Sequence, residues 1–212
     1  MIHGLPPMAA GTTRIVLVRH GEPDEHVRGR CYGRLDPGLS PLGREQMRHA
    51  WRLLRDEPLA AVYSSPSRRA VESTSLRAAD DPAVTVDERL REIDFGEFEG
   101  LSYDDIATRF PRQYEEWMAR PTEVVFPGGE SFGAMSARVL EAIGQIRRTH
   151  RGGTVVAVSH GGVNRIALAA ALDLDPRRIF RLDQTHAGVN VIDYIGDEPV
   201  LRVINAVAGV PC

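Results

Sequence analysis

Two apolar runs far apart in the chain each end in a histidine followed by a glycine. They are IVLVRHG at residues 15–21 and TVVAVSHG at residues 154–161. Uninterrupted β-branched and apolar residues are typical of parallel strands that are buried on both faces. Such strands lie in sheets that helices cover on both sides. The repeated pattern therefore predicts an α/β fold with an imidazole at the end of each of two buried strands.

The rest of the chain alternates between strand and helix patterns. Ser40-Pro41 is a typical helix start, with an N-cap serine followed by proline at the first helical position. Strand patterns cover residues 15–18, 61–64, 84–86, 154–159, 189–194 and 201–205, and helical patterns cover 41–54, two stretches within 101–120, 130–149, a stretch that begins just after Gly162 and runs to 172, and a short segment from 176. This alternation predicts βαβ units and a mostly parallel sheet, to which the final strand pair adds an antiparallel edge.

We therefore expect a single three-layer α/β/α domain over residues 14–212, preceded by a flexible tail over residues 1–13. No repeat, low-complexity tract or interdomain linker divides the sequence. The apolar stretch 200–210 suits either an interface between copies of the chain or the last edge strand, so a homo-oligomer and a monomer both stay open.

Composition excludes several classes of partner. The net charge is −3, and the 26 basic residues, all arginine, are interspersed with acidic residues. This gives no basic face of the kind that follows a nucleic-acid backbone. No apolar run is long enough for a membrane span or a secretory leader. The two cysteines, Cys31 and Cys212, lie too far apart for a disulfide framework, which indicates a reducing cytoplasm.

In parallel α/β sheets, ligands bind beyond the carboxyl ends of the strands. His20 and His160 are expected to meet there, with a glycine behind each that lets an anion approach the backbone. A single His-Gly pair is better explained as a polar turn. The repetition, together with Arg19, favours an anion site.

Two other chemistries fit less well. His20, Glu22 and His26 can be grouped as metal ligands, but the sequence has no HExxH motif, cysteine cluster or aspartate-rich loop, so we predict no metal. The segment GLSPL at 38–42 lacks the final glycine of the nucleophile elbow of serine hydrolases.

Four segments in order resemble the histidine phosphatase superfamily, in its phosphoglycerate-mutase-like branch. RHGE at 19–22 is similar to the defining motif, and Arg69-Ala70 resembles the segment of the second arginine. LREIDFGEFEG at 90–100 resembles the acid loop, and VSHGG at 158–162 resembles the segment of the second histidine. The likeness runs from about residue 14 to 205. It implies a phosphoglycerate-mutase-like fold and a phosphatase that uses no cofactor.

The resemblance also implies roles for individual residues. His20 is expected to be the nucleophile, forming a phosphohistidine that water later hydrolyses. Arg19, Arg69 and His160 are expected to surround the phosphoryl group. Glu92 is expected to be the general acid, whereas Glu97 and Glu99 shape the loop, and Arg68 is a surface residue.

Further contacts with the substrate are less specific. The backbone N–H of Gly161 is a candidate phosphate contact. His26 stands where many relatives have asparagine, so it either donates to the phosphate, adds a second titration or points away. Candidates for the rim of the pocket are Arg28, Arg30, Tyr32, Arg112 and Tyr114. A solvated loop explains these rim residues equally well.

Three functions compete. The first is a phosphomonoesterase for a small phosphorylated metabolite, favoured by the short span 100–129. Within that class CYGRLD at 31–36 resembles α-ribazole phosphatases, which remove a 5′-phosphate from a cobalamin lower-ligand precursor. The second is a cofactor-dependent phosphoglycerate mutase, an isomerase. The third is an inactive phosphoester-binding module, which would be expected to lack the nucleophile or the acid.

Overall fold

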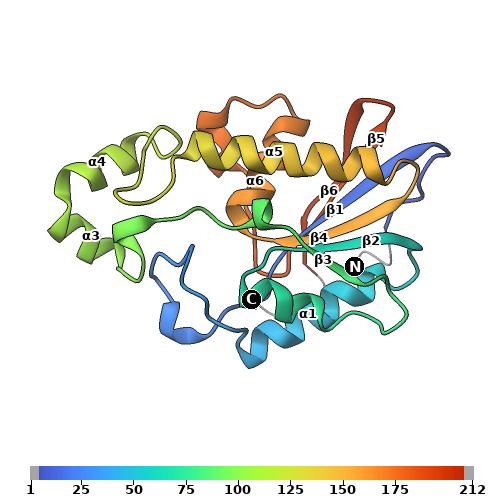
Figure 1. The fold of residues 1–212 in the computed structure, drawn as a ribbon, viewed down its shortest axis with the longest axis horizontal. Coiled ribbons are helices and arrows are strands. Elements are labelled where there is room, and N and C mark those ends of the chain that lie inside the picture. Colours follow the sequence, from blue (N-terminus) through green and yellow to red (C-terminus); the bar gives the residue numbers. More distant parts are fainter. Residues whose placement is uncertain (1–4, 208–212) are drawn as a thin grey trace.

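The computed structural model describes residues 5–207, in which one six-stranded sheet lies between two layers of helices (Figure 1). The strand order is β3-β2-β4-β1-β5-β6. β1 to β4 run parallel, whereas β5 runs antiparallel to both neighbours, β1 and β6. The strands are β1 (Thr12–Arg19), β2 (Leu59–Ser64), β3 (Val84–Val86), β4 (Thr154–Ser159), β5 (Val189–Ile195) and β6 (Glu198–Ala206). The predicted three-layer fold with its antiparallel edge is confirmed.

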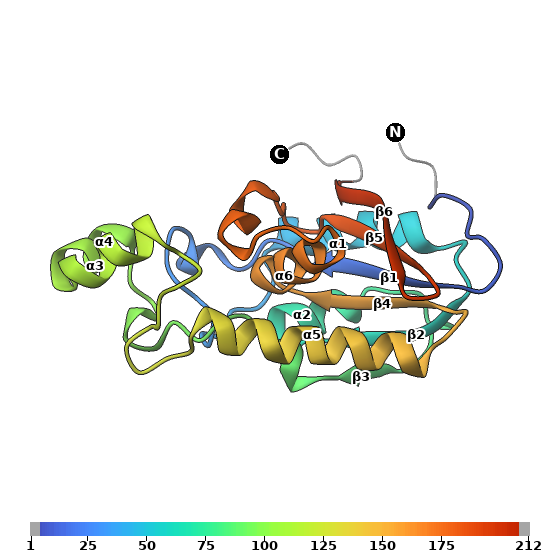
Figure 2. The same cartoon turned by 90° about the horizontal axis from the view of Figure 1, so that it is seen from above.

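Helices cover both faces of the sheet. α1 and α2 lie on one face and α5 and α6 on the other (Figure 1). α3 and α4 stand beyond one end of the sheet, and Figure 2 shows them apart from the layered body. The α-helices are α1 (Pro41–Leu54), α2 (Arg68–Thr74), α3 (Tyr103–Arg109), α4 (Pro111–Ala119), α5 (Phe132–Thr149) and α6 (Gly161–Ala171), and the short 3₁₀ helices are η1 (Glu25–Val27), η2 (Glu88–Leu90), η3 (Gly96–Phe98) and η4 (Pro176–Arg181).

β1 is buried on both sides, which explains its uninterrupted apolar run. Ile15 and Leu17 pack in the cluster that contains the apolar face of α5, whereas Val16 and Val18 pack in the cluster that contains α1. Burial of each such side chain contributes about 2 kcal/mol. The strand is therefore fixed from two sides, and the residue that follows it has little freedom to move.

Serine caps set the starts of the two long helices. Ser40 Oγ accepts a hydrogen bond from Gly43 N–H at 2.9 Å, as the Ser40-Pro41 pattern predicted. Ser131 caps α5 in the same way, through Ala134 N–H. The helix expected from residue 130 therefore starts two residues later. Glu130 lies before it, where its carboxylate binds Arg138.

The division into a tail and a domain stays a prediction. β1 begins at Thr12, and Leu5 packs, partly buried, against the cluster around α1. The tail's first four residues and the last five of the chain lie outside the described range. Within residues 5–207 no helix combines the length and apolar character that a membrane crossing needs.

Candidate active site

The two histidines that end buried strands lie side by side. β1 and β4 are neighbours, and Arg19 is in register with Ser159. His20 and His160 follow directly, and their ring centroids are 5.2 Å apart. Both side chains are buried. Parallel pairing of two strands with the same ending therefore brings together two imidazoles that are 140 positions apart, as the repeated pattern predicted.

His20 is held in one tautomer. Its Nδ1 lies 2.7 Å from the carbonyl oxygen of Gly21, so Nδ1 carries the proton and Nε2 has the lone pair. Arg69 Nε donates to that Nε2 at 3.3 Å. Burial, and then the charge of Arg69, holds the pKa of His20 well below its ordinary value. At neutral pH the ring is therefore uncharged, and Nε2 can act as a nucleophile once its hydrogen bond from Arg69 is broken.

Arg69 is buried without a carboxylate. It lies at the start of α2, and its guanidinium donates to the carbonyl oxygens of Leu35 at 2.9 Å and Tyr32 at 3.1 Å. Within residues 5–207 it forms no ion pair, and burial lowers its pKa. A buried cation with only neutral acceptors attracts an anion strongly.

Two more polar atoms near His20 are buried with their hydrogen-bonding capacity unused. Arg19 donates to the carbonyl of Gln184, but its Nε has no partner among the described residues. His160 Nε2 lies 2.8 Å from Ser65 Oγ, and its Nδ1 has no partner in the same range. When Nε2 accepts a hydrogen bond from the Ser65 hydroxyl, Nδ1 carries the ring's hydrogen and can donate to an anion.

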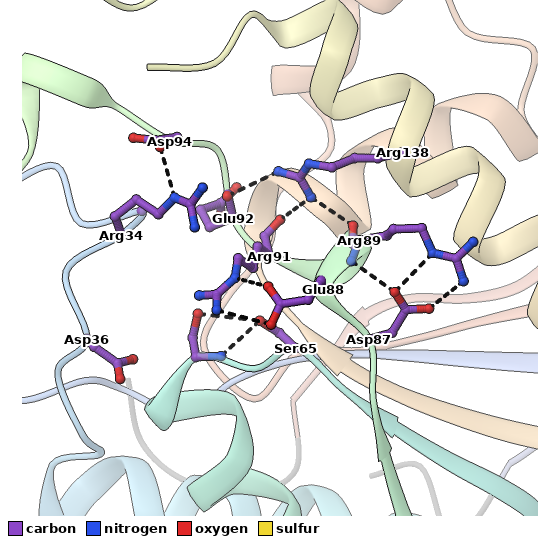
Figure 3. Close-up of polar contacts among 12 residues, drawn as sticks. Arg34, Asp36, Ser65, Asp87, Glu88, Arg89, Arg91, Glu92, Asp94 and Arg138 are labelled. Carbon is purple, nitrogen blue, oxygen red and sulfur yellow. Dashed lines mark hydrogen bonds and ion pairs between the residues drawn. The ribbon is translucent and has the colours of Figure 1, made fainter. Parts of the chain in front are cut away.

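Glu92 lies across the pocket from these groups on a loop that is tightly held. Its Oε2 accepts a hydrogen bond from Gly162 N–H at 3.1 Å, at the start of α6. A Cβ at Gly162 would lie 2.3 Å from Glu92 Oε1, so a larger residue there would displace the Glu92 carboxylate. Arg138 of α5 points into the loop and donates to the carbonyl oxygens of Arg89, Arg91 and Glu92 (Figure 3).

Glu99 shapes its own loop, as expected, by accepting a hydrogen bond from Phe95 N–H, and it also organises a second loop. Its carboxylate accepts hydrogen bonds from the backbone N–H groups of Gly33, Arg34 and Leu35. This loop presents the carbonyl oxygens that hold Arg69. The acidic segment 90–100 therefore supplies one carboxylate to the pocket and another that shapes its wall.

The pocket at this edge has a volume of about 250 Å³. One part is cationic and the other is apolar and rich in aromatic rings. Its lining consists of Arg19, His20, Arg30, Cys31, Tyr32, Arg69, Glu92, Ile93, Phe95, Tyr103, Trp117, Pro121, Phe126, Phe132, Met135, Gly162, Arg165, Ile179 and Phe180. Within residues 5–207 no cluster of three or more His, Cys, Asp or Glu side chains is arranged to hold a metal ion.

Of the remaining predicted site residues, some line the pocket and others lie outside it. Of the predicted rim, Arg30 and Tyr32 line the pocket, whereas Arg28 is exposed beside Glu22. Arg112 and Tyr114 lie on α4 and are not part of the lining. His26 is exposed, with Nδ1 2.7 Å from Asp24 Oδ1, and it does not line the pocket either. Gly161 opens α6 beside Arg19.

Sequence reasoning missed two groups. The ring of His186 lies 5.5 Å from that of His20, and its Nε2 is buried without a partner among the described residues. Burial, and then Arg19, lowers the pKa of His186 to about 3. Arg165 lines the pocket from α6, with Nε donating to the carbonyl of Leu182. His186 lies just before a strand pattern that starts at residue 189. Only the direction of that strand decides whether His186 lies at the same end of the sheet as His20, and no sequence pattern records that direction.

Comparisons with known proteins agree with this geometry. The chain matches the histidine phosphatase superfamily (branch 1) over residues 15–207. It is 32% identical over 180 residues to phosphoserine phosphatase 1 of Hydrogenobacter thermophilus, covering 84% of this chain and 85% of that protein. The chain spans only 55% of the length of three mycobacterial relatives, to which it is 37% identical.

Solved structures give the same result. The α-ribazole phosphatase of Shigella flexneri matches with a TM-score of 0.85 at 26% identity, over 94% of this chain and all of that one. A mycobacterial glucosyl-3-phosphoglycerate phosphatase matches with a TM-score of 0.82 at 29% identity, over 92% and 99%. The chain belongs to the histidine phosphatase superfamily. The predicted class, a phosphatase that hydrolyses phosphoric monoesters, is thereby confirmed.

Proposed function

We propose that this protein hydrolyses a small phosphorylated metabolite through a phosphohistidine formed at His20. One observation carries the proposal. Neutral His20 presents Nε2 beside Arg69, while the buried Arg19 Nε and His160 Nδ1 have no protein partner among the described residues. These cationic and neutral donors suit the oxygens of a phosphoryl group whose phosphorus faces Nε2. Arg69 and His160 thus act as phosphate contacts.

In the first step His20 Nε2 attacks phosphorus, and the bond from phosphorus to the ester oxygen breaks. Glu92, as the carboxylic acid, gives its proton to the departing alkoxide. Arg19, Arg69 and His160 stabilise the charge that spreads over the phosphoryl oxygens. The free alcohol leaves, and Glu92 remains as a carboxylate.

In the second step the Glu92 carboxylate takes a proton from water while that water's oxygen attacks phosphorus. The bond between His20 Nε2 and phosphorus breaks. Neutral His20, inorganic phosphate and protonated Glu92 are the products, so the site returns to its starting state. The hydrogen bond from Gly162 N–H keeps the Glu92 carboxyl at the pocket through both steps.

For the substrate, we propose a small phosphomonoester, with α-ribazole 5′-phosphate and O-phosphoserine as the first compounds to test. The likeness to an α-ribazole phosphatase and to a phosphoserine phosphatase supports this choice. We also propose a cytoplasmic location, which the free, buried thiol of Cys31 suits. A monomer and a homo-oligomer both stay open as predictions.

The test is a comparison of wild type with His20→Ala on p-nitrophenyl phosphate and on the two candidate metabolites. We expect wild type to release inorganic phosphate and to retain acid-labile label after a short reaction with radiolabelled substrate. His20→Ala should lose both signals, whereas His49→Ala, a histidine of α1 paired with Glu45, should keep them. A wild type without phosphate release would favour the inactive binding module and overturn the proposal.

The mutase is tested separately. With 3-phosphoglycerate and a trace of 2,3-bisphosphoglycerate, a phosphatase releases inorganic phosphate, whereas a mutase forms 2-phosphoglycerate. We expect no 2-phosphoglycerate. Its formation at a rate above phosphate release would replace the proposed hydrolase by an isomerase.

A further inference from the structure

The apolar half of the pocket is built mainly from aromatic side chains. We propose that the alcohol released by this phosphatase carries a flat aromatic ring, which binds between these side chains while the phosphate binds at His20. The substrate class is therefore a phosphate monoester of an alcohol with an aromatic substituent. This inference rests on the proposed phosphatase function and specifies what lies on the other side of the ester oxygen.

The aromatic wall is rigid before any ligand binds. The rings of Phe95 and Phe126 meet edge to face at 5.0 Å, and those of Trp117 and Phe126 at 5.2 Å. Tyr103 stacks on Trp117 with ring centroids 5.3 Å apart and an interplanar angle of 15°. These rings come from α3, α4 and the loops on either side of them. A wall whose rings are fixed by each other loses little entropy when another ring packs on it.

Two of the lining aromatics are exposed. Tyr103 is 46% and Phe180 is 54% exposed, although both are large apolar side chains. Phe180 lies on η4, which the neighbouring Ile179 anchors in the core. The guanidinium of Arg165 lies 5.5 Å from the Phe180 ring and orients it. Exposed aromatic rings at the mouth of a pocket can stack on a ring that enters it.

The charges of the pocket disfavour an amino group on the leaving alcohol. Among the described residues that line the pocket, Glu92 is the one carboxylate, and the proposed mechanism uses it. The other charged side chains that line the pocket are guanidinium groups, which repel an ammonium group. The competing interpretation is an acidic leaving group that Arg30 and Arg165 bind. Each uses one N–H group of its guanidinium on a backbone carbonyl, of Gly100 or Leu182, and the aromatic wall is the larger unassigned surface.

The test compares three substrates with the same CH₂–O–P linkage, namely benzyl, cyclohexylmethyl and ethyl phosphate. Because a phenyl group buries far more apolar area than a methyl group, kcat/KM for benzyl phosphate should exceed that for ethyl phosphate by roughly 10- to 100-fold. Cyclohexylmethyl phosphate should fall between them. Equal values for benzyl and ethyl, or a cyclohexylmethyl value at or above benzyl, would overturn the proposal. O-phosphoserine or 3-phosphoglycerate above benzyl phosphate would overturn it in favour of the acidic leaving group.

Variants locate the preference on the protein. Phe180→Ala and Tyr103→Ala change exposed side chains and should each lower kcat/KM for benzyl phosphate by about 5-fold, and that for ethyl phosphate by less. Ile204→Ala on β6 is the matched control, since Ile204 is also 46% exposed but lies outside the pocket lining. A preference for benzyl phosphate that survives both aromatic variants would show that these rings do not bind the leaving group, against the proposal.

Failure of this inference can be told apart from failure of the proposed function. Release of phosphate from p-nitrophenyl and ethyl phosphate without a preference for aromatic alcohols would remove only the inference. Absence of phosphate release from every ester would remove the phosphatase itself. His20→Ala, prepared in the same way, reports any contaminating phosphatase.

Discussion

Arg14 and Arg69 are both fully buried, and they differ in what surrounds them. Arg14 binds Asp193 with two hydrogen bonds, at 2.7 and 2.9 Å, and Glu57 lies 3.6 Å away. The hydrogen bond with Asp193 raises the pKa of Arg14. Arg69 has only neutral acceptors among the described residues, and burial lowers its pKa. A buried arginine that the fold has neutralised is structural, whereas one that it leaves without an anion is available for a ligand.

The largest effect is expected at Arg14. Arg14→Met leaves Asp193 buried without its main partner, which should lower the free energy of unfolding by about 3–5 kcal/mol. Urea unfolding measures the change. Activity of the folded variant should stay within about 3-fold of wild type, since Arg14 lies outside the pocket lining. The double variant Arg14→Met, Asp193→Leu should recover most of the stability. A double variant no more stable than Arg14→Met would contradict a purely structural pair.

At Arg69 the larger effect should be on activity and the smaller one on stability. Arg69→Gln removes a fixed cation from the proposed phosphate site, so kcat/KM should fall by about 100- to 1000-fold. The free energy of unfolding should change by only about 1 kcal/mol, because lost hydrogen bonds are offset by relief of an uncompensated buried charge. Steady-state kinetics and urea unfolding on one preparation check both. If Arg69→Gln were as unstable as Arg14→Met and kept nearly normal kcat/KM, Arg69 would be structural as well, against the proposed difference between the two arginines.

Arg138 is intermediate between Arg14 and Arg69. It binds the Glu130 carboxylate and also the backbone of the loop that carries Glu92. Arg138→Gln should lower kcat by about 10-fold, because Glu92, the proposed general acid, is then held less firmly. KM should change little. Arg89→Gln, which removes a neighbouring pair with Asp87, is the control. Equal kinetics for the two variants would rule out a positioning role.

The last prediction concerns pH. Burial, followed by nearby arginines, lowers the pKa values of His20, His160 and His186 in the folded protein. Above about pH 6.5 these rings are neutral in both folded and unfolded chains and contribute nothing. Below it only the unfolded chain gains their protons, so the free energy of unfolding falls by about 1.4 kcal/mol per pH unit for each histidine. His186→Asn should reduce this slope by one such increment between about pH 6 and 4. Urea unfolding that gives identical slopes would show that His186 is protonated in the folded state.

The sequence predicted the elements of the fold because burial on both faces leaves a direct record in β1 and β4. The Ser40 cap and the glycine after each histidine are equally local signals. The meeting of His20 and His160 followed from one rule, that parallel strands end at the same edge. Family resemblance then selected Arg69 over Arg68 and Glu92 over its acidic neighbours.

Other features depend on geometry that no local pattern records. The direction of β5 decides that His186 reaches His20. The sequence likewise did not show that Arg30 and Tyr32 reach the pocket while Arg112 and Tyr114 on α4 do not, because loop paths and helix placement decide this. The pairing of Arg14 with Asp193 joins residues 179 positions apart and has no sequence signal either.

The position of β1 in the sheet has a consequence for synthesis of the chain. β1 is made first, yet its two neighbours β4 and β5 are made more than half a chain later. A nascent β1 therefore emerges from the ribosome as an apolar strand without a partner on either edge, and such strands associate readily with one another. Long-range pairing of this kind also slows folding. We therefore expect the nascent chain to need protection of β1 until β4 and β5 are made.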